Sequence, residues 1–163
     1  MDERDRNIER RTGRLVRKIF RSHVENCLKS IWETVKLESD SDGDYPFLVG
    51  KAPAWVSVRE SGSTPAVRVF AYACVDVRRT LKLLAELNEI NAGSALCRVY
   101  RANGTIVVEA SLPWQLLDER ALQYLIDEVA AVATQVAELI ALVHGGRVPL
   151  EGVVAAAADD EVA

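Results

Sequence analysis

Apolar residues recur in steps of three and four along the first part of the chain, which is the spacing of one face of an α-helix. The residues before Leu15 carry too many charges to be buried, so we expect the start of this helix to fray. The turn-forming segment ESDSDGDYP (38–46) ends the pattern. Between residues 8 and 35 the apolar positions are Val16, Phe20, Val24, Cys27, Ile31 and Val35.

A period of two follows between residues 45 and 75, and this alternation is typical of strands in a half-buried sheet. YPFLV (45–49) contains Pro46, which cannot donate a hydrogen bond to a neighbouring strand and therefore suits an edge. AWVSVRE (54–60) and AVRVFAYACV (66–75) alternate on either side of the loop SGSTP. One face of these strands carries Ala54, Val56, Val58, Val67, Val69, Ala71 and Ala73, and the other carries Trp55, Ser57, Arg59, Arg68, Phe70 and Tyr72.

A second helical pattern begins near Asp76, which suits an N-cap, and ends near Asn91 with Gly93 as a left-handed stop. Asn103-Gly104 then favours a two-residue type I′ turn, because both positions of that turn need positive φ angles. This turn pairs Arg101 with Ile106, Tyr100 with Val107, Val99 with Val108 and Arg98 with Glu109. We expect one hairpin face in the core (Cys97, Val99, Ile106, Val108, Ala110) and Leu96, Arg98, Tyr100, Val107 and Glu109 on the other.

A third helix is expected from about Asp118 to the stop at Gly145-Gly146. Its apolar face is broad enough to pack on a sheet, on a second subunit, or on both. The order α-β-β-β-α-β-β-α predicts an α+β fold, an antiparallel five-stranded sheet with helices packed on one face. The apolar positions of this helix are Leu122, Leu125, Val129, Val132, Val136, Leu139 and Val143.

Composition places the chain among globular proteins, with 163 residues of which 49% are hydrophobic and 27% charged. We expect a basic N-terminal helix extension over 1–14, a single α+β domain over 15–144 and a mobile acidic tail over 145–163. The sequence has no apolar run that could span a bilayer and no secretory signal. Its cysteines, odd in number and surrounded by apolar residues, favour a reducing compartment and hence the cytoplasm: Cys27, Cys74 and Cys97.

Residues that could carry catalytic or metal chemistry are sparse. The chain has no glycine-rich phosphate loop and no nucleophile elbow. We expect structural roles for its two histidines, His23 and His144, and no zinc site, because paired histidines and a Cys-x-x-Cys motif are missing. The acidic segment DSDGD (40–44) lacks the glutamate that completes a calcium loop, so we expect a solvated turn. The sequence therefore predicts no enzyme activity, no metal and no cofactor.

Aromatic residues gather on the second face of the predicted sheet. Two interpretations remain open: this face binds a partner, or the first helix or a second subunit covers it. The candidate client-binding residues are Trp55, Phe70, Tyr72, Leu96, Tyr100 and Val107. An alternative function, a regulatory nucleic-acid-binding protein, would use the basic first helix, although the net charge of −4 argues against it. Its residues would be Arg10, Arg11, Arg14, Arg17, Lys18 and Arg21.

Two asparagines, Asn88 and Asn91, fall within the apolar arc of the second helix. Buried amides need hydrogen-bond partners, and helix ends and strand edges supply them. We therefore expect the pair to be structural and to connect the helix end with loop 92–95, which sets where the hairpin begins. The structural set is completed by Asn103 and Gly104 of the turn.

Three segments carry a family resemblance: YPFLVGKAPAWVSV (45–58), RVFAYACVDV (68–77) and LLAELNEINAGSALCRVYRANGTIVVEASLP (83–113). Over roughly residues 15–144 the chain resembles the YbjN-like branch of the type III secretion chaperone-like superfamily, in the form found in actinobacterial proteins. The resemblance implies a small non-enzymatic protein, often dimeric, that holds a client in extended form across apolar grooves. We therefore expect a cytoplasmic homodimer that binds an unidentified client protein or peptide on its sheet face, at the YPFLV edge or along the exposed flank of the third helix.

Overall fold

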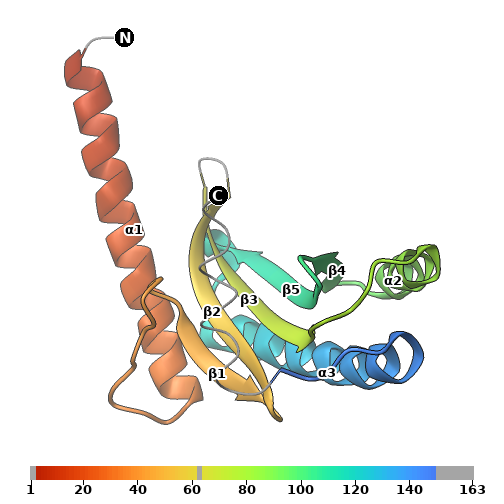
Figure 1. The fold of residues 1–163 in the computed structure, drawn as a ribbon. Helices are drawn as coiled ribbons and strands as arrows, with labels where there is room; N and C mark the ends of the chain where they lie inside the picture. The colour runs from red at the N-terminus through yellow and green to blue at the C-terminus, as the bar shows by residue number, and fades with distance from the viewer. Residues whose placement is uncertain (1–2, 62–63, 150–163) are drawn as a thin grey trace.

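Five strands form one antiparallel sheet, and helices pack against one of its faces (Figure 1). The computed structural model describes residues 3–61 and 64–149. The α+β class and the order of helices and strands predicted from the sequence are confirmed. In chain order the elements are α1 (Glu3–Ile31), β1 (Tyr45–Val49), β2 (Ala52–Ser61), β3 (Thr64–Cys74), α2 (Leu81–Gly93), β4 (Arg98–Ala102), β5 (Thr105–Pro113), the 3-10 helix η1 (Trp114–Leu116) and α3 (Glu119–His144).

Antiparallel hairpins build the sheet, whose strand order is β1-β2-β3-β5-β4. The turn between β4 and β5 has positive φ angles of 44° at Asn103 and 84° at Gly104, as the predicted type I′ turn requires. The pairing that follows is the predicted one and places Arg98 opposite Glu109. The turn between β1 and β2 is also short, and Gly50 adopts a φ of 61° there.

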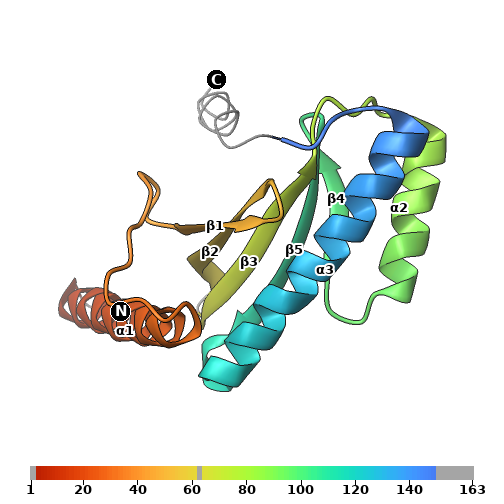
Figure 2. The ribbon, with the colours of Figure 1, turned by 90° about the horizontal axis from the view of Figure 1, so that it is seen from below.

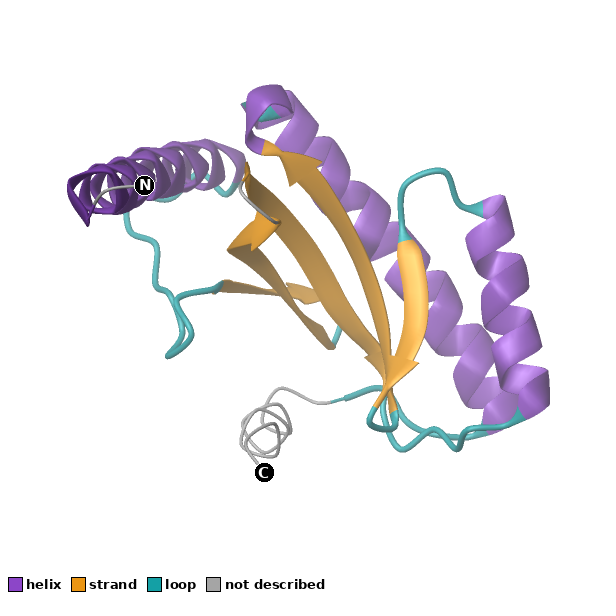
Figure 3. Ribbon diagram, turned by 90° about the horizontal axis from the view of Figure 1, so that it is seen from above, coloured by secondary structure: helices purple, strands orange, loops and turns teal. Residues whose placement is uncertain are grey.

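The main core lies between one face of the sheet and the helices. α3 runs along this face, and α2 lies beside α3 next to β4 (Figures 2 and 3). The described helices leave the opposite face of the sheet uncovered (Figure 3). The valines predicted to face the core are buried in it together with residues of α1 and α3: Val56, Val67, Val69, Val99, Val108, Phe20, Val24, Leu28, Leu122, Leu125 and Val129.

α1 is only partly supported by the rest of the molecule, and its N-terminal half extends beyond the sheet (Figure 1). Leu15 and Ile19 are 59% and 62% exposed, so no apolar surface packs against this part of the helix. The helix ends at Ile31, so the predicted continuation to Val35 is wrong. Glu33 has a φ of 49°, which breaks the helix, and Val35 is 94% exposed.

α2 begins later than the sequence pattern predicts. Its N-cap is Thr80, whose hydroxyl accepts a hydrogen bond from the Leu83 N–H at 3.1 Å, and the predicted N-cap at Asp76 is wrong. The reason is tertiary: Val77 is buried and donates its N–H to the Gly104 carbonyl at 2.9 Å, so residues 76–80 form a connection between strand and helix. At the other end α2 stops at the extended Ser94 and not at a left-handed glycine.

Candidate functional site

Four of the predicted client-binding residues meet on the uncovered face of the sheet, and we call them the aromatic cluster: Trp55, Phe70, Tyr72 and Val107. The pairing of β2 with β3 places Trp55 opposite Phe70, and their rings stack with centroids 5.1 Å apart. The Tyr72 ring lies 4.9 Å from Trp55 and is half-buried. The cluster is separate from the main core, and no apolar residue of α1 packs on it within the described chain.

A buried carboxylate adjoins this cluster. Glu109 is only 5% exposed and accepts hydrogen bonds from Arg68 Nε at 2.6 Å and from the Tyr100 hydroxyl at 3.1 Å. Arg98 forms an ion pair with the other carboxylate oxygen. The Arg68 guanidinium also lies 4.4 Å from the centre of the Phe70 ring, a cation–π contact that links the polar network to the cluster.

A second buried carboxylate lies further along the same face. Asp44 accepts a hydrogen bond from the Ser57 hydroxyl at 2.7 Å and pairs with Arg59 at 2.9 Å. Burial raises the pKa of Asp44, although Ser57 and Arg59 lower it in part. Three arginines thus lie beside two carboxylates on this face. We call these arginines the basic rim: Arg59, Arg68 and Arg98.

The two remaining candidates lie near β4. Tyr100 is 37% exposed and pairs with Val107, so it borders the aromatic cluster as predicted. Burial raises the pKa of the Tyr100 phenol, and the Glu109 carboxylate adds to this effect. Leu96 packs against the main core instead, because β4 begins only at Arg98 and strand alternation does not extend to residue 96.

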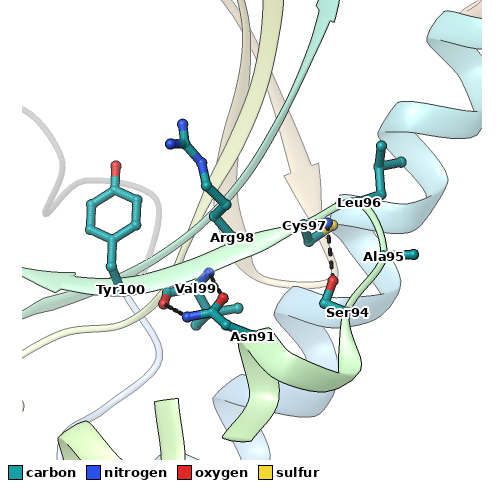
Figure 4. A pocket seen from close by; sticks show the side chains of 8 residues that line it. All are labelled: Asn91, Ser94, Ala95, Leu96, Cys97, Arg98, Val99 and Tyr100. Carbon is teal, nitrogen blue, oxygen red and sulfur yellow. Dashed lines mark hydrogen bonds between the residues drawn. The ribbon is translucent and has the colours of Figure 1, made fainter. Parts of the chain in front are cut away.

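The outer edge of β4 is occupied by side chains of the α2 end, as Figure 4 shows. Asn91 donates to the Val99 carbonyl at 2.8 Å and accepts from the Val99 N–H at 2.7 Å. The Ser94 hydroxyl accepts from the Cys97 N–H at 3.0 Å. Both Asn88 and Asn91 are exposed, so their predicted burial in the apolar arc is wrong. The helix turns only Asn91 toward the strand.

β1 is the other outer strand of the sheet, and its free edge differs from that of β4. In a two-residue hairpin the flanking residues exchange hydrogen bonds, so Tyr45, Phe47 and Val49 direct their backbone groups toward β2. Pro46 and Leu48 therefore direct theirs outward. No strand pairs with this outer edge among residues 3–61 and 64–149. The edge therefore offers backbone groups that an extended chain could bind.

Sequence reasoning anticipated an exposed flank on the third helix but missed the exposed apolar residues of α1 and α2. Leu15, Val16 and Ile19 are exposed on the extended half of α1, and the high charge density around them is the signal that this half is not buried. A second group lies on the neighbouring helices α2 and α3, where Leu81 and Leu142 are 87% and 86% exposed. Both groups are candidates for contacts with other proteins.

The histidines and cysteines make contacts within the fold. His23 Nε2 lies 3.3 Å from the Leu117 carbonyl oxygen, and His144 Nε2 lies 2.6 Å from a carboxylate oxygen of Glu86. Burial raises the pKa values of all three cysteine thiols, which keeps them protonated and weakly reactive.

The acidic turn is closed by Asp40, whose carboxylate accepts hydrogen bonds from the N–H groups of Asp42 and Asp44. In the part of the chain that the structure describes, no group of three or more His, Cys, Asp and Glu residues could hold a metal ion. None of the helices in that part is long and apolar enough to cross a membrane.

Comparison with known proteins identifies a matching family model and solved structures with the same fold. The family model TY-Chap1, described as "T3SS (YopN, CesT) and YbjN peptide-binding chaperone 1", matches residues 19–152. No curated protein matches the sequence. Among solved structures, the HopA1–SchA chaperone–effector complex matches with a TM-score of 0.59 and 12% identity, over 76% of this chain and 97% of the other.

Two further structures have the same fold. The Yersinia pestis type III secretion chaperone SycH, in complex with a stable fragment of YscM2, matches with a TM-score of 0.54 and 12% identity, over 71% of this chain and 98% of the other. YbjN from E. coli matches with a TM-score of 0.52 and 17% identity, over 77% of this chain and 93% of the other. Together with the family match over residues 19–152, these findings show that the chain belongs to the TY-Chap1 family of T3SS (YopN, CesT) and YbjN peptide-binding chaperones.

Proposed function

We propose that this chain is a non-enzymatic chaperone that shields apolar segments of a client protein or peptide on the uncovered face of its sheet. The aromatic cluster is the observation that carries the proposal, since it places apolar rings on a face that the described helices leave open (Figure 3). Tyr72, the half-buried member of the cluster, and Tyr100, which borders the cluster and is 37% exposed, would contact the client first. The solved chaperones of this fold that are described with effectors or fragments support a protein ligand.

Backbone pairing at β1 adds to the affinity in this proposal. An extended client strand would bind the outward groups of Pro46 and Leu48, while its side chains contact the sheet face. The β4 edge is unsuitable, because Asn91 already bonds both outward groups of Val99. The client therefore binds at the β1 edge.

A homodimer and a cytoplasmic location complete the proposal. The exposed leucines of α2 and α3, Leu81 and Leu142, are suited to an apolar contact between two copies. Three free, buried cysteines are compatible with a reducing compartment. Sedimentation of Leu81→Glu/Leu142→Glu should then give the mass of a monomer, and an unchanged dimer would place the subunit contact elsewhere.

The test of the function uses an immobilised library of random 12-residue peptides as the probe. The chain should select peptides rich in apolar residues, and Tyr72→Asp/Tyr100→Asp should abolish this selection with little change in the melting temperature. Val35→Asp serves as the control, because Val35 is 94% exposed and lies in the loop between α1 and β1, outside the strands.

Tyr124→Asp separates the sheet face from the helix flank, since Tyr124 is 59% exposed on α3. Loss of peptide selection in Tyr124→Asp, with selection intact in the double tyrosine variant, would move the client site to the helix. A large fall in the melting temperature of Tyr72→Asp/Tyr100→Asp would show that the aromatic cluster is a second core and would contradict the proposal.

A further inference from the structure

The outer strand β1 is joined to α1 by a long connection. Residues 32–44 leave the end of the helix and run back beside it before β1 begins (Figure 1). A connection of this length does not by itself fix the position of the strand that follows. In the part of the sheet that the structure describes, β1 pairs with β2 alone, and strands with few neighbours open more readily than central ones. The start of β1 therefore needs further contacts to stay in place.

Two side chains of α1 make these contacts, and we call Arg21 and Glu25 the α1 clamp. The Arg21 guanidinium donates to the Gly43 carbonyl at 2.5 Å and lies 5.1 Å from the centre of the Tyr45 ring. The Tyr45 hydroxyl donates to Glu25 Oε1 at 2.5 Å, and Arg21 Nε lies 3.5 Å from the same carboxylate oxygen. Because the two clamp residues are one helix turn apart, they face the same side of α1 and bind the chain on either side of residue 44.

The residues that enter β1 are suited to these partners. A Cβ atom at Gly43 would lie 3.3 Å from Arg21 Nη1, so glycine leaves room for the guanidinium. Tyr45 is only 2% exposed, and burial, followed by the hydrogen bond to Glu25, raises the pKa of its phenol. The hydroxyl therefore stays protonated and remains the donor. Asp44 accepts a hydrogen bond from β2 instead, so the start of β1 is held by α1 on one side and by β2 on the other.

The opposite end of β1 is fixed by the short turn at Gly50, which pairs Val49 with Ala52. The outward backbone groups of Pro46 and Leu48 lie between these two fixed ends. The side chains of the α1 clamp are 38% and 35% exposed, and ion pairs as exposed as this add little to overall stability. Their effect is therefore local: they determine where the outer edge of β1 lies before anything binds to it.

We propose that Arg21 and Glu25 are positioning residues that hold β1 ready for the addition of a client strand, without contacting the client themselves. A strand that is already in place loses less freedom when the client pairs with it. If β1 is in place in only a fraction of the molecules, the apparent affinity is reduced by that fraction. This role rests on the proposed binding of a client strand at the β1 edge.

Binding kinetics separate positioning from direct contact. The probe is a fluorescent peptide selected from the random library, and stopped-flow mixing gives both rate constants. Arg21→Ala/Glu25→Ala should lower the association rate constant about fivefold, because fewer free molecules have β1 in place. The dissociation rate constant should stay the same, because the clamp makes no contact with the peptide. Glu25→Gln keeps an oxygen that can accept the Tyr45 hydrogen bond and should retain most of the association rate.

Lys36→Ala/Glu38→Ala is the matched control. It removes an exposed ion pair of 2.7 Å from the same connection, with the same zero change in net charge, and leaves the α1 clamp intact. Both rate constants should equal those of the native chain. An equal loss of association rate in this control would contradict a specific role of the clamp. An unchanged association rate constant in Arg21→Ala/Glu25→Ala, or an effect confined to the dissociation rate constant, would overturn the proposal.

Amide hydrogen exchange of the free protein needs no peptide. In Arg21→Ala/Glu25→Ala the N–H groups of Tyr45 and Phe47, which face β2, should exchange about tenfold faster, while that of Val69 in the middle of the sheet keeps its rate. Equal acceleration at Val69 would indicate a loss of overall stability and would contradict a local role. If the exchange accelerates as expected but the library selects no peptide, the client function fails, and the positioning role fails with it. If the library selects peptides and exchange in β1 is unchanged, the inference alone fails.

Discussion

The side-chain amide of Asn91 forms two hydrogen bonds with the backbone of Val99, one from each outward-facing group of the strand. The amide nitrogen donates to the carbonyl at 2.8 Å, and the Val99 N–H donates to the amide oxygen at 2.7 Å. This is the pattern that a neighbouring strand would make at the same position. One outer strand of the sheet is thereby occupied from within the chain, and β1 is the outer strand left for pairing.

Asn91→Ala should lower the free energy of unfolding, because it leaves both groups of Val99 without their partner. Each unmet buried group costs about 1–3 kcal/mol, and partial access of water to this edge favours the lower end of that range. Urea denaturation measures the loss. Asn88→Ala is the matched control on the same helix, and its exposed side chain predicts a change within about 0.5 kcal/mol. Equal effects of the two substitutions would contradict the role assigned to Asn91.

Leu48→Pro tests backbone pairing at the β1 edge. Proline removes the outward N–H of residue 48 and leaves the pairing of β1 with β2 intact, so the melting temperature should change little. The affinity for a peptide selected from the random library should fall about fivefold, which corresponds to the net contribution of about 1 kcal/mol from one hydrogen bond.

Leu48→Ala is the control for this experiment, since it shortens the same half-exposed side chain and keeps the donor. Fluorescence anisotropy of the labelled peptide gives both affinities. A larger loss with Leu48→Ala than with Leu48→Pro would assign the contact to the side chain and would exclude strand addition at this edge.

Gly104→Ala should destabilise the β4–β5 hairpin, because Gly104 has a φ of 84° that residues with a Cβ atom adopt at a cost of about 1–2 kcal/mol. A steric clash would not account for this loss of stability, because the nearest atom to a Cβ added at Gly104 is 3.8 Å away. Gly93→Ala is the control. Gly93 lies at the end of α2 with nothing within 4 Å, and its replacement should stabilise the protein or leave it unchanged.

The features that the sequence predicts well depend on local chemistry. The dipeptide Asn103-Gly104 favours a type I′ turn by its own backbone preferences, and the turn fixes the register of β4 with β5. This register could therefore be predicted without any knowledge of the packing in the core. The Asp118 N-cap is similar, because its carboxylate bonds the Ala121 N–H within the same helix turn.

The errors arise where a distant contact decides the outcome. Asp76 looks like an N-cap, yet the buried Val77 and its bond to Gly104 delay the helix by a turn. Asn88 and Asn91 are the same residue type and both are exposed, and only the position of β4 gives Asn91 a backbone partner. The pairing of Arg98 with Glu109 follows from the turn, but the contacts of Arg68 with Glu109 and of Arg59 with Asp44 depend on how the more distant strands pair.

Asp44 predicts how stability depends on pH. Burial raises the pKa of this carboxyl, partly opposed by Ser57 and Arg59, so the folded protein retains a proton at pH values where the unfolded chain has lost it. The folded state is therefore favoured by protonation, and this contribution decreases as the pH rises from about 4, the ordinary value for aspartate, through the raised pKa. Above the raised pKa the contribution is constant.

The side chain in Asp44→Asn does not ionise. The difference in unfolding free energy between the native chain and this variant therefore measures the pH-dependent contribution of the Asp44 carboxyl. The difference should fall with increasing pH above about 4 and then level off. Ser57→Ala removes the hydrogen bond that lowers the pKa of Asp44, so the curve should still begin to fall at the same pH but should continue to fall up to a higher pH. Urea denaturation at a series of pH values measures both curves. A difference that rises with pH over this range would mean that Arg59 outweighs burial, and the carboxylate would then stabilise the fold in its charged form.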